Sequence, residues 1–202
     1  MTKKILFGSG NQAKFFHMRA LLKNMPFEIF SPKDLGIDLD VVEDGETPED
    51  NARGKARAYH LASRMPTFSI DAGLFIDRFP PERQPGPFVR RIFEGEREAT
   101  DGEMLDYYTR ELGRVGGESK GKWITAIALA ISPDKTFSET FSRPTFLTAR
   151  RSLTLIPGAP LSSIQMDPIS GKYYSEMTYE ERGDDPETLG IVAFLKKKIE
   201  RE

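Results

Sequence analysis

The sequence predicts an α/β fold in a single domain with a small lobe, and three observations support this prediction. The chain has 202 residues, of which 38% are hydrophobic and 30% charged, which is enough to bury one sizeable core. A short apolar run at residues 5–7 precedes a glycine turn and a helical pattern, as when a strand leads into a helix. Later segments combine β-type composition with turn signals, as antiparallel strands do.

The first part of the chain predicts strands that alternate with helices. Residues 5–7 form the first strand, residues 12–23 a helix with an apolar stripe, and residues 28–30 a second strand. Val41 and Val42 close another short extended piece.

A second helix is predicted from its start signals. Thr47 is suited to the N-cap and Pro48 to the first helical position, and the pattern continues to about Arg64. Residues 67–70 then form a strand that ends at residues 71–73. The remaining elements are predicted as a proline-rich loop at 79–86, a helix at 101–112, a glycine-rich connection at 113–121, strands within 123–131 and 137–155, and an amphipathic helix at 186–202.

Composition excludes several classes of function. The net charge of -2 and the lack of a long basic run give no source for phosphate-backbone binding, so nucleic acid is not expected as a partner. With no cysteine and only His17 and His60, neither thiol chemistry nor an imidazole zinc site is expected. The apolar run at 5–7 is too short for a secretory signal and nothing resembles a membrane span, which predicts a cytoplasmic protein.

The first candidate site is residues 9–14, SGNQAK, where a strand leads into a helix. Amides at a helix N-terminus attract anions, and glycines let the backbone approach a phosphate. Lys14 is informative because a cation in the first turn opposes the helix dipole unless an anion is bound there. The alternative is a solvated surface lysine beside an ordinary turn.

The second candidate site joins residues 43–46 to the following helix, on which Asn51 and Lys55 share a face. Carboxylates suit Mg2+, which prefers oxygen ligands and bridges phosphate oxygens. Lys55 could then reach a polyphosphate. The alternative is a polar loop beside a well-capped helix whose face lies in water.

The third candidate is Asp71, at the predicted carboxyl end of an apolar strand. Ligands of open α/β sheets gather outside such strand ends, which makes Asp71 a candidate metal ligand or general base. The alternative is an aspartate that bonds its own turn.

Taken in order, these segments resemble the inosine triphosphate pyrophosphatase family, the non-standard purine nucleoside triphosphate pyrophosphatases. The motifs that carry the resemblance are SGNQAK at 9–14, EDGET at 43–47, DNARGKA at 50–56, IDAGL at 70–74, PGPFVRR at 85–91, MDPI at 166–169 and SEM at 175–177. The resemblance spans most of the chain, and its N-terminal half is the specific part.

The resemblance implies an elongated mixed central sheet flanked by helices, with two lobes of a single domain (1–202), a nucleotide cleft between them, and commonly a homodimer. It implies a Mg2+-dependent hydrolase that converts a nucleoside triphosphate to the monophosphate and pyrophosphate. The residues it assigns are Asp71 and Lys55 for catalysis, Glu43 and Asp71 for metal, and Ser9, Gly10, Asn11, Lys14, Lys55 and Asp167 for substrate. Phe88 is a further candidate, for stacking on the base; the alternatives are stacking by Tyr173 and simple packing of either ring.

Several positions depart from the family pattern. His17 replaces a glutamate, Ile70 replaces the first acid of a pair, and Ala72 and Val89 replace serines. The Ser-His-Arg segment that reads the base has no equivalent in residues 181–187, and a Gly-Phe-Gly is absent from 160–165. An altered base preference is therefore predicted, because discrimination rests on paired polar groups. The alternatives are a nucleotide-binding or regulatory paralogue without efficient catalysis, and a structural paralogue.

Overall fold

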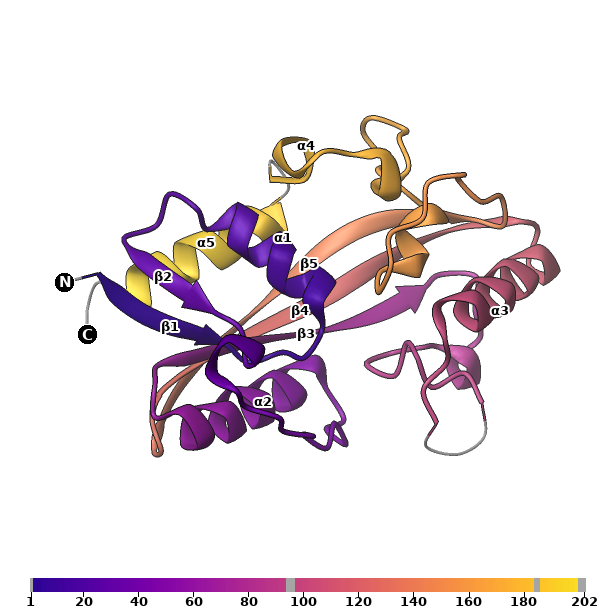
Figure 1. Cartoon of the computed structure of the whole chain (residues 1–202). Helices are drawn as coiled ribbons and strands as arrows, with labels where there is room; N and C mark the ends of the chain where they lie inside the picture. Colours follow the sequence, from indigo (N-terminus) through magenta and orange to yellow (C-terminus); the bar gives the residue numbers. More distant parts are fainter. Residues whose placement is uncertain (1, 94–96, 184–185, 200–202) are drawn as a thin grey trace. The chain divides into compact units, whose positions relative to one another are not determined.

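A computed structural model describes residues 2–93, 97–183 and 186–199 (Figure 1). These residues fall into two compact units. The first unit comprises Met1–Ala72, Thr125–Phe141 and Gly183–Glu202, and the second comprises Gly73–Ile124 and Ser142–Arg182. Strands β3, β4 and β5 each have residues in both units.

The elements form the mixed α/β fold that the sequence predicts. In chain order they are β1 Lys3–Phe7, α1 Gln12–Leu21, β2 Phe27–Phe30, α2 Pro48–Ser63, β3 Thr67–Ile76, α3 Asp101–Arg114, β4 Glu118–Ser132, β5 Lys135–Thr148, β6 Gln165–Met166, α4 Tyr179–Gly183 and α5 Pro186–Ile199. The six strands form one sheet in the order β2-β1-β3-β4-β5-β6. Strand β1 is parallel to β2 and β3, whereas β5 is antiparallel to β6, so the sheet is mixed.

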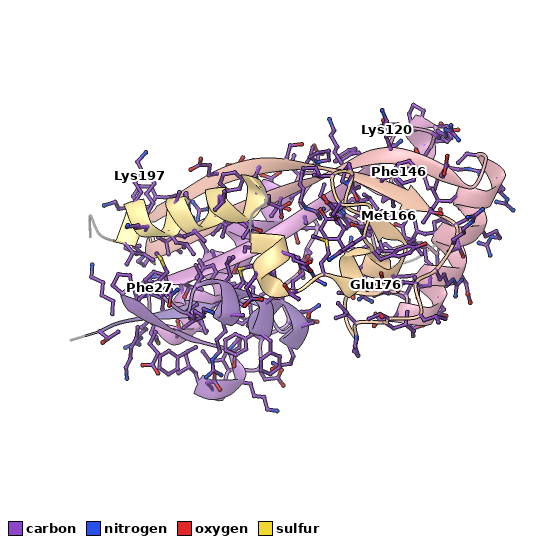
Figure 2. All side chains as sticks on the ribbon, turned by 90° about the horizontal axis from the view of Figure 1, so that it is seen from above. Phe27, Lys120, Phe146, Met166, Glu176 and Lys197 are labelled. Atoms are coloured by element: carbon purple, nitrogen blue, oxygen red, sulfur yellow. The ribbon has the colours of Figure 1, made fainter. Side chains whose placement is uncertain are left out.

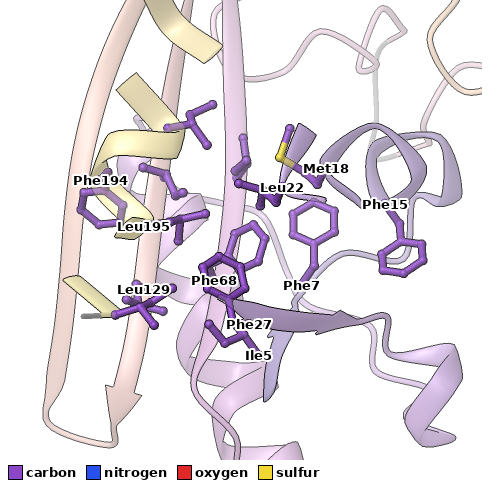
Figure 3. Close-up of a cluster of buried hydrophobic side chains, with 14 residues drawn as sticks. Ile5, Phe7, Phe15, Met18, Leu22, Phe27, Phe68, Leu129, Phe194 and Leu195 are labelled. Carbon is purple, nitrogen blue, oxygen red and sulfur yellow. The ribbon is translucent and has the colours of Figure 1, made fainter. Parts of the chain in front are cut away.

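In the first unit, β4 separates two packing layers because successive strand residues point to opposite faces. One layer is made only of alanines, which allow α2 to lie close to the sheet: Ala52, Ala56, Ala126, Ala128 and Ala130. On the other face, Ile127 and Leu129 join a larger cluster with α1 and α5 (Figure 3). The aromatic centre of that cluster is Phe7 against Phe68, with ring centroids 5.0 Å apart.

Helix α2 has the start that its sequence predicts. The Thr47 Oγ1 accepts a hydrogen bond from the Asp50 amide at 3.2 Å, and Pro48 occupies the first turn. The helix ends at Ser63, and its C-cap Arg64 has a left-handed φ of 57° that directs the chain toward β3. The caps at Thr47 and Arg64 therefore define both ends of α2, the helix that carries Asn51 and Lys55.

The second unit has its own core. Leu74 and Ile76 of β3 and Leu147 of β5 pack with the buried face of α3. A capping box of Thr100 and Glu103 starts α3, and hydrogen bonds from Arg97 and Thr100 lower the pKa of Glu103 to about 2. Figure 2 labels Phe146 and Met166, which face each other across the β5–β6 pair.

The prediction that the third strand ends at residues 71–73 is wrong. Strand β3 continues to Ile76, and Asp71 lies inside it. Leu74 and Ile76 are fully buried in the core of the second unit, so apolar burial favours an extended chain over a turn.

Three other boundaries also differ from the predictions. Residues 41–42 are not in a strand, since Val42 is 77% exposed and gains nothing from extension. The connection predicted at 113–121 is shorter, because the left-handed Gly116 and Gly117 complete the reversal and β4 begins at Glu118. Strand β5 spans Lys135–Thr148, so it begins before the predicted 137–155 stretch and leaves residues 149–155 outside the strand. The C-terminal helix is confirmed through Ile199, and residues 200–202 lie outside the described part.

Candidate active site

The carboxyl end of β1 lies beside the segment of β3 that leads to Asp71. The two strands are parallel, with Leu6 opposite Thr67 and Phe7 opposite Phe68. Beyond the pairing, the Gly8 amide donates to the Phe68 carbonyl at 2.8 Å, and the Ser69 hydroxyl donates to the Gly8 carbonyl at 2.7 Å. The turn predicted to bind phosphate therefore comes directly after the carboxyl end of β1, and α/β proteins place ligands at such strand ends.

Within this turn, Asn11 is the N-cap of α1. Its Oδ1 accepts from the Lys14 amide at 3.1 Å, and the Ser9 hydroxyl accepts from the Asn11 amide at 3.3 Å. Gly10 and the Lys14 side chain are exposed. The turn thus combines a positive helix end with an exposed lysine, which is a physically suitable place for an anion.

The two glycines of this turn have different surroundings. A Cβ on Gly8 would lie 2.5 Å from the Ser69 Oγ and 2.9 Å from the Tyr59 ring, whereas a Cβ on Gly10 would meet nothing within 4 Å. Gly8 is therefore the position where the backbone of the turn must pack closely against α2 and β3. The sequence assigned Gly10 to phosphate binding and gave Gly8 no role beyond the turn itself.

The first unit contains a buried lysine that lies between two carboxylates. The Lys55 Nζ is 2.7 Å from the Asp71 Oδ1 and 3.1 Å from the Glu43 Oε1. The side chains of Lys55 and Asp71 are only 8% and 6% exposed, whereas that of Glu43 is 40% exposed. A buried charge needs such a partner, so the sequence alternatives of a solvated helix face and a self-bonded turn do not describe these residues.

Asn51 joins the same group of residues. Its Nδ2 donates to the Asp71 Oδ2 at 3.3 Å, and its Oδ1 accepts from the Gly45 amide at 2.8 Å. Asn51 and Lys55 lie one helical turn apart on α2, and both bond to Asp71. Sequence reasoning noted their shared face but assigned Asn51 no role.

One turn further along the same face lies Tyr59. Its hydroxyl donates to the Leu39 carbonyl at 3.1 Å. Burial raises the pKa of Tyr59, and the nearby Lys55 charge opposes this rise only in part. Tyr59 is therefore a neutral residue through which α2 packs against the glycine turn.

The donor atoms suit a hard divalent cation. Glu43 and Asp71 place a carboxylate oxygen each within 3.1 Å of a single nitrogen, so the two oxygens are close neighbours. Within the described residues, no group of three or more histidines and acids is gathered for a metal. Mg2+ commonly binds one or two carboxylates together with substrate phosphates, so two acids are an adequate protein set.

The substituted position Ile70 lies on the other face of β3 from Asp71, because adjacent strand residues alternate. It is 8% exposed and packs in the same cluster as Phe7 and Phe68. An acid at position 70 would thus not share a face of the strand with Asp71. Its replacement by isoleucine leaves the Asp71–Lys55 pair intact.

The two remaining predicted substrate residues belong to the second unit. Phe88 is half-buried, and the Arg91 guanidinium lies over its ring at 4.7 Å. Asp167 accepts from the Ser170 amide at 2.7 Å, which is a local turn contact. Their roles stay predictions, as do those of Ser9, Gly10, Asn11 and Lys14. Asp184 and Asp185, within the segment that lacks the base-reading pattern, lie outside the described residues.

Parallel strands, a turn at a helix N-terminus, a buried lysine and two carboxylates are brought together in the first unit, an arrangement typical of α/β proteins that bind nucleotides or phosphates. The chain belongs to the Ham1 family, whose model matches residues 5–145. The family resemblance predicted from the N-terminal motifs is thereby confirmed.

Two curated relatives are both named dITP/XTP pyrophosphatase. That of Anaeromyxobacter dehalogenans is 42% identical over 119 residues, which are 57% of this chain and 50% of the relative. That of Acholeplasma laidlawii is 31% identical over 135 residues, 66% of this chain and 63% of the relative. The chain thus matches about half of the first relative's length and under two thirds of the second's.

A solved structure shows the same fold over nearly the whole chain. The Ham1 protein from Coxiella burnetii aligns with a TM-score of 0.77 at 20% identity, covering 99% of this chain and 100% of that one. Among the described helices, none combines the length and the apolar character that crossing a membrane requires.

Proposed function

We propose that this chain is a Mg2+-dependent nucleoside triphosphate pyrophosphatase that hydrolyses a nucleoside triphosphate to the monophosphate and pyrophosphate. The observation that carries the proposal is the buried Lys55 ammonium, held between Asp71 and Glu43 beside the glycine turn. The names of the curated relatives support the same reaction. Residues 1–202 would act as one domain, in the cytoplasm and as a homodimer, as the family resemblance implies.

The chain's own residues divide the work of this reaction. Ser9, Gly10, Asn11 and the Lys14 ammonium would bind the phosphates at the N-terminus of α1. Lys55 would hold a phosphate oxygen and neutralise charge that develops as the bond breaks. Asp71 would accept a proton from the attacking water, whose oxygen bonds to phosphorus while the electron pair of the broken α–β linkage leaves with pyrophosphate.

Glu43 and Asp71 would hold the metal ion. When bound, Mg2+ would neutralise phosphate oxygens and polarise the phosphorus under attack. The two carboxylates fit this role because they are near neighbours and Glu43 is partly exposed. Phe88 and Asp167 would contribute to binding the nucleoside.

A changed base preference is the second part of the proposal. Residues 181–187 hold no Ser-His-Arg segment, so the polar groups that would pair with a 6-oxopurine are missing from that part of the sequence. Without such donors, a site discriminates weakly between bases. We therefore expect kcat/KM for dITP and for dGTP to differ by less than about tenfold.

The test is pyrophosphate release from a panel of dITP, XTP, dGTP, dATP, dCTP and dTTP, with and without Mg2+. Release from at least one triphosphate that stops on metal removal supports the proposal. Binding of triphosphates without release would support the regulatory paralogue instead. A large preference for dITP over dGTP would contradict the altered base preference alone.

A further inference from the structure

We propose that Asn51 is a positioning residue of the candidate active site, which holds Glu43 and Asp71 in fixed relation without touching substrate or metal. This inference rests on the proposed function, because it concerns the geometry of the same two carboxylates. Three features carry it: the burial of Asn51, its two hydrogen bonds, and the closed space around Gly45.

Asn51 is buried, with 4% of its surface exposed. Burying an amide is costly unless its polar atoms are hydrogen-bonded. Here both ends of the side chain are used, because the oxygen accepts from Gly45 and the nitrogen donates to Asp71. A residue with no donor or no acceptor at its tip cannot make both bonds.

The bond to Gly45 fixes the loop that carries Glu43. The Gly45 amide lies 2.8 Å from the Asn51 Oδ1, and a Cβ on Gly45 would approach that oxygen to 2.7 Å. The loop backbone therefore packs directly against the amide, two residues after Glu43. This close packing brings the Glu43 carboxylate to 3.1 Å from Lys55.

The bond to Asp71 fixes the carboxylate on β3. Asn51 donates to Oδ2 at 3.3 Å and Lys55 to Oδ1 at 2.7 Å, so two donors from one face of α2 bind both oxygens. Rotation of the carboxylate would break one of these bonds. A single helix thereby determines where both candidate metal ligands stand.

A buried side chain with a purely structural role would behave differently, and His60 supplies the comparison on the same helix. It lies on the same helix, is 8% exposed, and its Nδ1 is 2.7 Å from the Met65 carbonyl. Loss of that bond affects the C-terminal end of α2 and neither carboxylate. His60→Ala should therefore lower the melting temperature and leave metal affinity and turnover unchanged.

The experiment compares the full-length wild type with Asn51→Ala, Gly45→Ala, the double variant and His60→Ala. Electron paramagnetic resonance measures the Kd of each protein for Mn2+ in the absence of nucleotide. Steady-state assays measure kcat and KM, and thermal unfolding measures Tm. Loss of an outer partner of a metal ligand typically costs about 10- to 100-fold in affinity or activity. We expect Asn51→Ala and Gly45→Ala each to weaken Mn2+ binding about tenfold and lower kcat at least about tenfold, with KM changed less than about threefold.

The double variant should lose little more than either single variant, because both substitutions disrupt one link. The positioning role would be overturned if Asn51→Ala and Gly45→Ala both lowered Tm but left Mn2+ affinity and kcat unchanged. It would also be overturned if the losses in the double variant were the sum of two independent losses. A wild type that binds no Mn2+ would overturn it together with the metal site. A wild type that binds Mn2+ but releases no pyrophosphate would overturn the proposed function alone, because the Mn2+ arm still tests Asn51.

Discussion

Two regions of the candidate site differ in how far the protein's own contacts fix them. The first is the group of Glu43, Lys55 and Asp71, and the second is the glycine turn after β1. Lys55 and Asp71 are buried and only 2.7 Å apart, with Asn51 bonded to the same carboxylate. In the turn, Gly10 and the Lys14 side chain are exposed, and Gly8 alone is closely packed. The comparison shows that contacts within the protein fix the Lys55 group much more closely than the turn. Within the proposed function, the first would be preorganised for reaction and the second would adapt to the phosphates.

The largest expected effect is that of Asp71→Asn, which keeps the shape of the side chain and removes its charge. General-base catalysis contributes about 100- to 10,000-fold, so pyrophosphate release should fall about a thousandfold. Steady-state assays on protein verified as folded by circular dichroism would measure it. Asp77→Asn, an exposed acid just beyond β3, is the control and should keep full activity. Activity within tenfold of wild type would remove Asp71 from the mechanism.

Lys55→Met should separate two consequences of one charge. Removing a positioned cation typically lowers turnover about 100-fold or more. The same change leaves Glu43 and Asp71 without their counterion, so nucleotide-free Mn2+ affinity should rise about tenfold. Parallel assays of turnover and Mn2+ binding test this, with the exposed Lys23→Met as control. Weaker Mn2+ binding would mean that Lys55 and the metal do not share the two carboxylates.

In the glycine turn, Lys14→Ala should weaken binding of the phosphate groups and leave binding of the nucleoside unchanged. A hydrogen bond to a charged group contributes about 2 kcal/mol, so affinity for a non-hydrolysable triphosphate should weaken about 30-fold. Affinity for the matching nucleoside should not change, and calorimetry can measure both. Equal losses for the two ligands would contradict a phosphate role for Lys14.

The smallest expected effect distinguishes the two glycines of the turn. Gly8→Ala should lower the free energy of unfolding by about 1–3 kcal/mol, since its Cβ would overlap the Ser69 Oγ. Gly10→Ala should change it by less than about 0.5 kcal/mol. Urea denaturation of both variants provides the measurement, and similar losses in the two would show that the turn is equally constrained throughout.

Local patterns made much of this fold predictable. The cap at Thr47, Pro48 and the spacing of Asn51 and Lys55 describe α2 as it is observed. The length of β3 was not predictable in the same way, because its continuation past Asp71 depends on burying Leu74 and Ile76 against α3, far along the chain. Tertiary packing here overrides the local turn signal of residues 71–73.

The candidate site shows the same division. The motif at 43–56 predicted a carboxylate for the metal and Lys55 for the polyphosphate, but not that Glu43 and Lys55 contact each other at 3.1 Å. The hydrogen bonds from Asn51 to Gly45 and Asp71 could not be derived from residue spacing. They depend on α2 lying next to β3 in the folded chain. The burial of Asn51 and the close packing of Gly45 appear only in the folded chain, so residues 43–56 carry no separate signal for this link.

The most direct measurement is 31P nuclear magnetic resonance of the products formed from dITP and dGTP with Mg2+. A site that combines the Lys55 group with the glycine turn predicts one equivalent each of nucleoside monophosphate and pyrophosphate, and release about a thousandfold slower after Asp71→Asn. Orthophosphate and a nucleoside diphosphate, or an undiminished Asp71→Asn variant, would contradict it.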